Sequence, residues 1–306
     1  MSGARSVTRS QAQHVRLPRF RQLPYWLLAL CVMLPIAQVA HAGDGRLLAT
    51  GGATQVEGSA GGGLVPWAVL AGYGTRDEFG GTAYYTQLQL PDYRLDSYGA
   101  AFTIDNRVEF SVARDRFDLG TLGKAIGMPG AALRQDILGV KWRLAGDLVY
   151  GDLPQISIGA QQKHDLDFTI PQLAGARHAS GTDVYIAATR LVLGGAGGYD
   201  LLWNVTLRSS NANQFGLLGF GGDRGDRHWL AEGSLAMLFN PNWAVGLEYR
   251  QKPDNLSFAR EDHAADGFLA WFPNKRLALV AAYVDLGSIA GLDRQRGWYL
   301  SLQGSL

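Results

Sequence analysis

Hydrophobic and polar residues alternate with a period of two in many segments of about ten residues along this chain. The stretch DILGVKWRLAG (136–146) shows the pattern, with one face carrying Leu138, Val140, Trp142 and Leu144 and the other Gly139, Lys141 and Arg143. The stretch GWYLSLQGSL (297–306) repeats it with Trp298, Leu300, Leu302 and Leu306 on one face. Strict alternation predicts β-strands rather than helices.

Thirteen such segments follow one another, near 64–74, 81–90, 94–104, 107–116, 134–146, 154–164, 182–193, 199–209, 228–239, 243–252, 265–272, 276–285 and 297–306. The connections between them alternate in length: 105–106, 194–198, 240–242 and 273–275 are short, whereas the stretches that precede and follow them are long. Outer-membrane barrels combine ten-residue alternating strands with short turns at one end and long loops at the other. The pattern therefore predicts a transmembrane antiparallel β-barrel of the outer-membrane type, in preference to a periplasmic β-sandwich.

The predicted barrel occupies residues 75–306. Bacterial barrels have even strand numbers, so thirteen segments predict twelve strands from residue 81 onward, or fourteen if 46–57 pairs as well. The Gly-rich extension 43–74 is then either a plug or an extra strand.

Residues 1–42 have the features of a secretory signal peptide. Five arginines and no acid precede the apolar run YWLLALCVMLPIAQVA, which ends in AHA before Gly43. A positive region, an apolar region and small residues at the cut define such a signal, so we expect cleavage after Ala42. The barrel would then reach the outer membrane, where its partners would be lipids and the barrel-assembly machinery.

Composition narrows the function classes of the exported chain. The only cysteine, Cys31, lies inside the predicted signal, so no disulfide or thiol chemistry is expected. Without the five arginines, 23 basic residues stand against 27 acidic ones, a net charge of −4. Because phosphate binding requires a basic footprint, nucleic acid is not an expected partner. Nor does any sequence motif predict a cofactor.

Charged residues fall on the face opposite the apolar stripes, at Lys141, Arg143, Arg208, Glu232, Glu248 and Arg250. A charge facing lipid at mid-strand costs a few kcal/mol, whereas a wet lumen accepts it. We therefore predict that these six side chains line the lumen. They would either set the ion preference of a small pore or pair with one another and fill the barrel.

An acidic stretch, KPDNLSFAREDHAADGF (252–268), raises the question of a cation site. Its candidate ligands are Asp254, Glu261, Asp262, His263 and Asp266. Hard oxygen ligands suit Ca²⁺ or Mg²⁺, but the spacing matches no calcium loop, and a single His forms no zinc cluster. A polar loop at the outer end of the barrel is the favoured interpretation, and no metal is predicted.

A barrel-embedded hydrolase is a weaker alternative. His164, His178, His228 and His263 each stand near an acid or a serine in the sequence, yet no nucleophile motif surrounds them. The chain is therefore not predicted to be an enzyme.

Several long motifs resemble a known family. TGGATQVEGSAGGGLVPWAVLAGYGT, NQFGLLGFGGDRGD, KPDNLSFAREDHAADGF, AYVDLG and QRGWYLSLQ occur in order over 46–306 and are similar to a proteobacterial family known as domain of unknown function 3034. The resemblance implies an exported β-rich protein of outer-membrane type, and it implies no activity, ligand or catalytic residue.

The pattern and the resemblance lead to one expected function with an alternative. We expect a small-solute pore or channel with a charged lumen. The alternative is a closed barrel that serves as an envelope scaffold or as a surface-binding module through its long loops.

Overall fold

A computed structural model describes residues 45–306. The predicted signal peptide and its cleavage after Ala42 lie outside the described residues. Within residues 45–306, no helix is long and apolar enough to cross a membrane.

Within the same residues, twelve strands form a closed antiparallel barrel. The strands are β3 Phe79–Gln89, β4 Arg94–Ile104, β5 Val108–Asp118, β6 Ala132–Ala145, β7 Gln155–Asp165, β8 Ser180–Ala196, β9 Tyr199–Ser210, β10 His228–Asn240, β11 Trp243–Arg250, β12 Ala264–Asn274, β13 Leu277–Asp285 and β14 Arg296–Ser305. Each pairs with its neighbours in sequence, and β14 pairs with β3 to close the wall. The prediction of a twelve-stranded barrel is confirmed, and the fourteen-strand alternative is wrong.

The alternation in the sequence decides which way each side chain points. In β14, Trp298, Leu300 and Leu302 are exposed on the outside of the wall, whereas Tyr299, Ser301 and Gln303 are buried inside it. The other strands follow the same period of two, because successive residues of a strand face opposite sides. Buried side chains therefore gather in the lumen, where the core of this protein lies.

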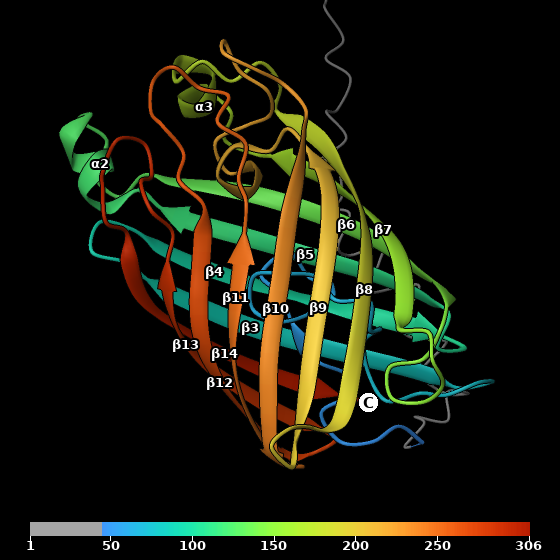
Figure 1. Ribbon diagram of the computed structural model, residues 1–306. Helices are drawn as coiled ribbons and strands as arrows, with labels where there is room; N and C mark the ends of the chain where they lie inside the picture. Colours follow the sequence, from blue (N-terminus) through green and yellow to red (C-terminus); the bar gives the residue numbers. More distant parts are fainter. Residues whose placement is uncertain (1–44) are drawn as a thin grey trace, which may run out of the picture. The chain divides into compact units, whose positions relative to one another are not determined.

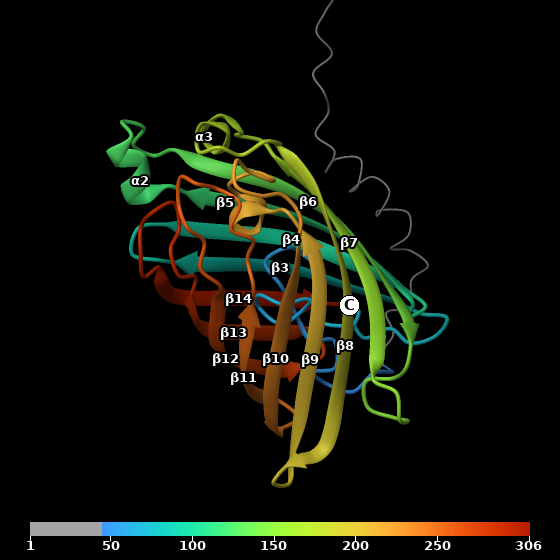
Figure 2. The same cartoon turned by 45° about the horizontal axis from the view of Figure 1, so that its top comes forward.

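The two ends of the barrel differ (Figures 1 and 2). Short turns join β4 to β5, β10 to β11 and β12 to β13 at the end where β14 finishes; we call this the short-turn end. The opposite, long-loop end carries the short helices α2 Gly120–Ala125 and α3 Thr169–Leu173 and the 3-10 turn η2 Asn213–Gly216.

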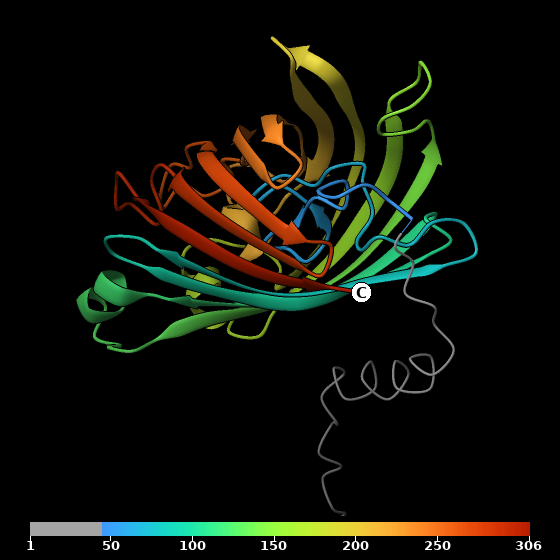
Figure 3. The same ribbon diagram turned by 90° about the horizontal axis from the view of Figure 1, so that it is seen from below.

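Residues 45–75, called the plug segment below, enter the ring of strands, and residues 49–74 lie buried inside it (Figure 3). Its two short strands, β1 Ala53–Thr54 and β2 Ala60–Gly61, pair only with each other and take no part in the wall. Residues 64–74, although they show the period-two pattern, therefore form no strand of the wall. Trp67 of the plug segment is buried and donates from Nε1 to Ser234 Oγ at 2.8 Å.

Candidate functional site

The charged side chains expected in the lumen occupy two different places. Lys141, Arg208, Glu232, Glu248 and Arg250 lie on the inward face and are each at most 3% exposed. Arg143 shares this face but lies at the short-turn end, where its Nη2 donates to Gly146 O at 2.6 Å and lies 3.1 Å from Asp147. Five of the six residues therefore come together around the plug segment, and Arg143 does not.

The plug segment presents a carboxylate at the tip of a tight turn. Gln55 N donates to Ser59 O at 3.0 Å and Gly58 N donates to Gln55 O at 2.9 Å, which closes the turn between β1 and β2. Gly58 has a φ of +93°, which disfavours other residues, and a Cβ placed there would lie 3.0 Å from Ala113 Cβ. The turn thus requires glycine, and it carries Glu57 into the middle of the lumen.

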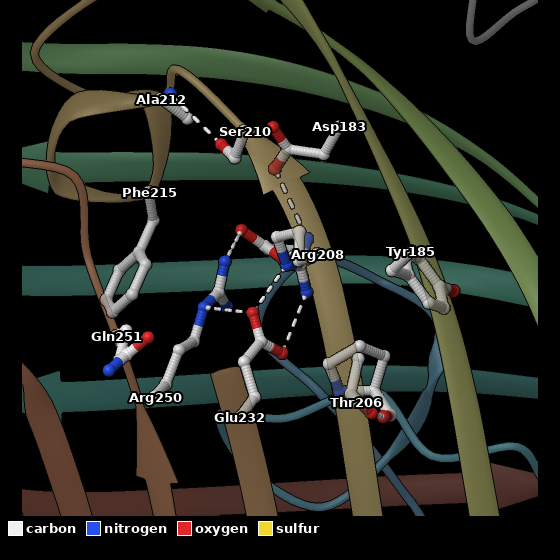
Figure 4. Close-up of polar contacts among 12 residues, drawn as sticks. Asp183, Tyr185, Thr206, Arg208, Ser210, Ala212, Phe215, Glu232, Arg250 and Gln251 are labelled. Atoms are coloured by element: carbon white, nitrogen blue, oxygen red, sulfur yellow. Dashed lines mark hydrogen bonds and ion pairs between the residues drawn. The ribbon is translucent and has the colours of Figure 1, made fainter. Parts of the chain in front are cut away.

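Three cations from three strands meet the Glu57 carboxylate. Arg250 Nη2 lies 2.7 Å from Oε1, Arg208 Nη1 lies 3.4 Å from Oε2, and Lys163 also pairs with Oε1. Two acids of the wall complete the group, with Asp183 Oδ2 2.8 Å from Lys163 Nζ and Glu232 pairing with Arg208 and Arg250. Figure 4 shows the two guanidinium groups converging on Glu232. We call the wall residues Lys163, Asp183, Arg208, Glu232 and Arg250 the central belt.

The central belt keeps Glu57 ionised. Burial alone raises the pKa of this carboxyl group, but Arg250, Lys163 and Arg208 outweigh burial and hold its pKa far below the usual range. A charge this deep in a protein is tolerated only when it is paired and hydrogen-bonded. Glu57 is therefore a carboxylate wherever the plug segment sits as described.

Two further acids of the wall bind the backbone of the plug segment. Glu248 Oε2 accepts from Gly63 N and Leu64 N, both at 2.7 Å, and a Cβ at Gly62 would lie 1.9 Å from Glu248 Oε1. Glu109 accepts from Ala60 N at 3.2 Å and Ala71 N at 2.8 Å. Gly62 therefore permits the close approach, and both acids satisfy amide groups that would otherwise be buried without partners.

The carbonyl groups of the plug segment are bound in the same way. Lys141 Nζ donates to Ala60 O at 2.7 Å and Val69 O at 2.9 Å, while Ser157 Oγ donates to Ala68 O at 2.6 Å. Polar side chains of the wall thus replace the water that an irregular backbone would otherwise need. This is why the lumen of this barrel is so polar at mid-height.

Towards the short-turn end the lumen becomes apolar. We call this region the apolar floor; its wall residues include Leu148, Leu191, Leu202, Ala236, Ala244, Phe272 and Val280. Between them and the plug residues Ala53 and Trp67 lies a cavity of about 40 Å³, about the size of one or two water molecules. The plug segment therefore leaves almost no open space in this part of the barrel.

The long-loop end is closed by its own loops. Gln214 N donates to Glu261, its Nε2 donates to Ser288 O at 3.0 Å, and Lys252 Nζ donates to its Oε1 at 2.9 Å. Burial lowers the pKa of Lys252 to about 8 and raises that of Glu261 to about 7, although each charge partly offsets the shift of the other. Loops 211–227, 251–263 and 286–295 thus meet at Gln214 and cover the lumen.

The five candidate cation ligands of residues 252–268 are dispersed by the structure. Asp254 lies 3.4 Å from Arg224, Asp262 accepts from Ser288 N at 3.1 Å, and His263 packs edge-on against Tyr249. Glu261 binds Gln214, and Asp266 is paired in register with Glu248 inside β11 and β12. In the described part of the chain, no three His, Cys, Asp or Glu residues are grouped to hold a metal ion.

The histidines considered for a hydrolase have other partners than expected. His164 Nδ1 lies 2.6 Å from Ser180 Oγ on the exposed outward face, and Asp136, which faces His164 in the register, binds Arg114 with both oxygens. His228 Nε2 contacts Asn255 Oδ1 at 2.9 Å. The one Ser–His pair of this group therefore has no carboxylate available as a third member.

Several residues of this site were missed from the sequence: Glu57, Glu109, Lys163 and Asp183. For Lys163 a signal exists, because Ile156, Ile158 and Ala160 define the outward face of β7 and place Lys163 on the other. Asp183 lies in β8, where Val184, Tyr185 and Ile186 are apolar on both faces. The sequence therefore does not predict whether the Asp183 side chain points into the lumen or outward. Glu57 lies in a Gly-rich stretch with no periodicity, and its position depends entirely on the barrel around it.

Comparison with known proteins gives one family. A family described as "Protein of unknown function (DUF3034)" matches residues 50–303. No curated protein matches the chain.

Solved structures resemble the chain only distantly. The KdgM porin has a TM-score of 0.45 at 9% identity, covering 74% of this chain and 99% of the other. The Acinetobacter baumannii outer membrane protein Omp33 has a TM-score of 0.44 at 10% identity, covering 74% and 98%. Outer membrane phospholipase A from Escherichia coli has a TM-score of 0.36 at 7% identity, covering 73% and 91%. At TM-scores below 0.5, such likenesses tell nothing about what this chain does.

Proposed function

The chain belongs to the DUF3034 family of proteins of unknown function, and we propose that it is an outer-membrane channel for small solutes which the plug segment closes at rest. The channel opens when the plug segment leaves the central belt. The barrel wall contacts outer-membrane lipids, and the short-turn end faces the periplasm.

The outward face supports the membrane placement. It carries large apolar side chains that are exposed on strand after strand, including Leu138, Val205, Leu247, Leu269 and Leu300. Aromatic pairs flank this band, with Trp243 stacked on Trp271 at 5.6 Å near the short-turn end and Tyr283 against Trp298 at 5.3 Å near the other. An apolar band between aromatic girdles is the surface of a barrel in a bilayer.

A pair of arginine substitutions tests this placement. Leu247, 65% exposed at mid-band in β11, contacts lipid, so Leu247→Arg should lower the free energy of unfolding in lipid vesicles by about 2–4 kcal/mol. Leu173 is 83% exposed but lies in α3, so Leu173→Arg is the matched control and should change stability little. Equal effects would contradict the placement.

One observation carries the channel function: the wall does not fill its own lumen. Small polar residues, among them Ser97, Ser111, Ser157, Thr189, Thr206, Ser234 and Ser301, share its inward face with the large side chains of Lys141, Lys163, Tyr185 and Arg208, and the plug segment occupies the space that remains. A barrel of eight strands is filled by its side chains, and one of sixteen leaves an aqueous channel. With twelve strands, this lumen is filled by the wall and the plug segment together, and the plug segment is joined to the wall through the residues before β3. Removal of the plug segment would leave a passage that is polar at the central belt and apolar at the apolar floor.

A reversible lock tests the channel in the full mature chain. Ala68 N donates to Thr189 Oγ1 at 2.7 Å, so these two residues bring plug and wall into direct contact and are the pair chosen for an engineered disulfide, and the predicted mature chain has no cysteine of its own. The variant Ala68→Cys/Thr189→Cys should be silent in planar bilayers when oxidised, and reduction should restore the openings, seen as discrete conductance steps, that occur whenever the plug segment leaves the central belt. Either single-cysteine variant is the control and should not respond to reduction. Heat-modified gel mobility verifies the folded barrel.

The outcome separates the two functions considered from the sequence. Conductance that depends on reduction supports the gated channel. A folded barrel that stays silent after reduction, and also after deletion of residues 45–74, would contradict it and support the closed scaffold instead.

A further inference from the structure

The central belt has the geometry of a carboxylate-binding socket. Lys163, Arg208 and Arg250 approach one carboxylate from three strands, and Arg250 Nη2 and Arg208 Nη1 contact its two different oxygens at 2.7 and 3.4 Å. Guanidinium groups recognise carboxylates through such directed, charge-assisted hydrogen bonds. Glu57 therefore occupies the position that a carboxylate ligand would take.

The wall holds these cations in place without help from Glu57. Arg208 donates from Nη1 to Gln161 Oε1 at 2.9 Å, pairs with Glu232, and lies over the Tyr185 ring at 5.2 Å. Arg250 lies over the Phe215 ring at 4.3 Å, and Lys163 pairs with Asp183 at 2.8 Å. Ion pairs on the wall and cation–π contacts with Tyr185 of β8 and Phe215 of η2 therefore preserve the socket when the plug segment leaves.

The charges of the socket balance only when a carboxylate is present. Among residues 45–306, the three cations pair with the two wall acids Asp183 and Glu232 and with Glu57. When Glu57 leaves, three positive charges face two negative ones among these ion-paired groups, and the buried Asp115 is a further acid within electrostatic reach of Lys163 and Arg250. The vacated socket then has one buried positive charge in excess, which is costly until an anion restores the balance.

We propose that the central belt is a binding site for small carboxylate solutes, that Glu57 occupies it at rest as a tethered substitute, and that a carboxylate solute displaces Glu57. The choice of solute rests on the proposed channel function, whereas the binding site itself does not. A tethered competitor acts at an effective concentration of about millimolar. Free carboxylates therefore open the intact protein only in excess of this value.

Acetate and acetamide provide a matched pair of probes, because they have nearly the same shape and only acetate is charged. The thermal unfolding midpoint of the full mature chain is measured with each probe, with sodium chloride holding the ionic strength constant. In Glu57→Ala, acetate should raise the midpoint in a saturable manner, and acetamide should not. In the wild type, the same shift should require at least about tenfold more acetate, because Glu57 competes.

Two controls identify the site of binding. Thr54→Val removes a plug-to-wall hydrogen bond, 2.7 Å from Thr54 Oγ1 to Gln303 Oε1, and leaves Glu57 in place, so it should respond as the wild type does. Glu57→Ala/Arg250→Gln keeps the socket empty but removes the cation excess, so the response to acetate should disappear. Glu57→Gln replaces Glu57→Ala if the alanine variant does not fold.

The results distinguish the site from the channel. A saturable acetate response in Glu57→Ala supports the socket, even if no variant conducts and the channel function fails. A barrel that conducts after unlocking but shows equal responses to acetate and acetamide, or equal responses in Glu57→Ala and wild type, would overturn the socket and leave the channel intact.

Discussion

The central belt and the apolar floor hold the same plug segment by different forces. The belt binds it through ion pairs and through hydrogen bonds between wall side chains and plug backbone. The floor packs Leu202, Ala244 and Phe272 against Ala53 and Trp67. Water and dissolved ions can replace the first kind of contact, because they offer the same bonds, but they cannot replace the second.

Because of this difference, the central belt and the apolar floor have different effects on the plug segment. The central belt selects which solute can replace Glu57, because its hydrogen bonds are directional and its charges must balance. The floor resists withdrawal in every solution, because exposure of its apolar surface to water is unfavourable whatever the solute. Substitutions in the two regions should therefore differ in whether a dissolved anion changes their effect.

The largest effect is expected from Lys163→Met in the belt. It leaves Glu57 and Asp183 with one cation fewer in a fully buried position, so the free energy of unfolding should fall by about 3–5 kcal/mol. Urea unfolding in detergent measures it. Lys124→Met, on the exposed face of α2, is the control and should be close to wild type. A stable Lys163→Met barrel would mean that Arg208 and Arg250 suffice for both acids.

Leu202→Ala in the apolar floor should lower the free energy of unfolding by about 3 kcal/mol, because it removes a buried side chain and enlarges an existing cavity. The same urea unfolding applies, with and without acetate. Acetate should leave this loss unchanged, in contrast to the belt variant Glu57→Ala. If acetate restored the free energy of unfolding of Leu202→Ala, the proposed difference between the central belt and the apolar floor would be wrong.

Trp67 joins the two regions, since its indole lies in the floor and its Nε1 donates to Ser234 on the wall. Trp67→Phe keeps most of the packing and removes the hydrogen bond, so we expect the free energy of unfolding to fall by about 1 kcal/mol. Ser234 also donates to Glu248 at 2.7 Å. Because Ser234→Ala removes both bonds, it should cost more than Trp67→Phe, and the reverse order would contradict this arrangement.

The last prediction concerns the loop cap. Burial raises the pKa of Glu261 to about 7 from its ordinary 4.5, so its contribution to the closed loops is complete below pH 4.5 and is lost as the pH rises through 7. Lys252 keeps its charge in this window, because its pKa is about 8. After correction for the intrinsic pH dependence of exchange, hydrogen exchange of residues 211–222 should therefore report more frequent opening at pH 7 than at pH 5, by about tenfold for each unit of the shift.

Glu261→Gln should remove this pH dependence, because an amide does not titrate. Asp293→Asn, on the exposed part of the neighbouring loop, should retain it. An unchanged pH profile in Glu261→Gln would assign the titration to another group.

Residues of this site could be predicted from the sequence where the period-two pattern of their strand is clear. Lys141, Arg208, Glu232, Glu248 and Arg250 were placed on the inward face because apolar neighbours on the same strand marked the outward one. The sequence predicts that the acids of 252–268 lie in a polar outer loop. Glu261 is nevertheless only 6% exposed, because its loop folds onto Gln214. No periodicity in a loop reveals such a contact.

By itself, the sequence determined the strands, their inward and outward faces, the alternation of turns and loops, and a strand number of twelve or fourteen. These properties follow from the local geometry of a pleated chain, in which each residue's direction depends only on its neighbours. Tertiary structure alone decided that Glu57 meets Lys163, Arg208 and Arg250. Residues more than a hundred positions apart met there because closure of the wall made one enclosed space, and only the plug segment could supply the charge and the backbone groups to fill it.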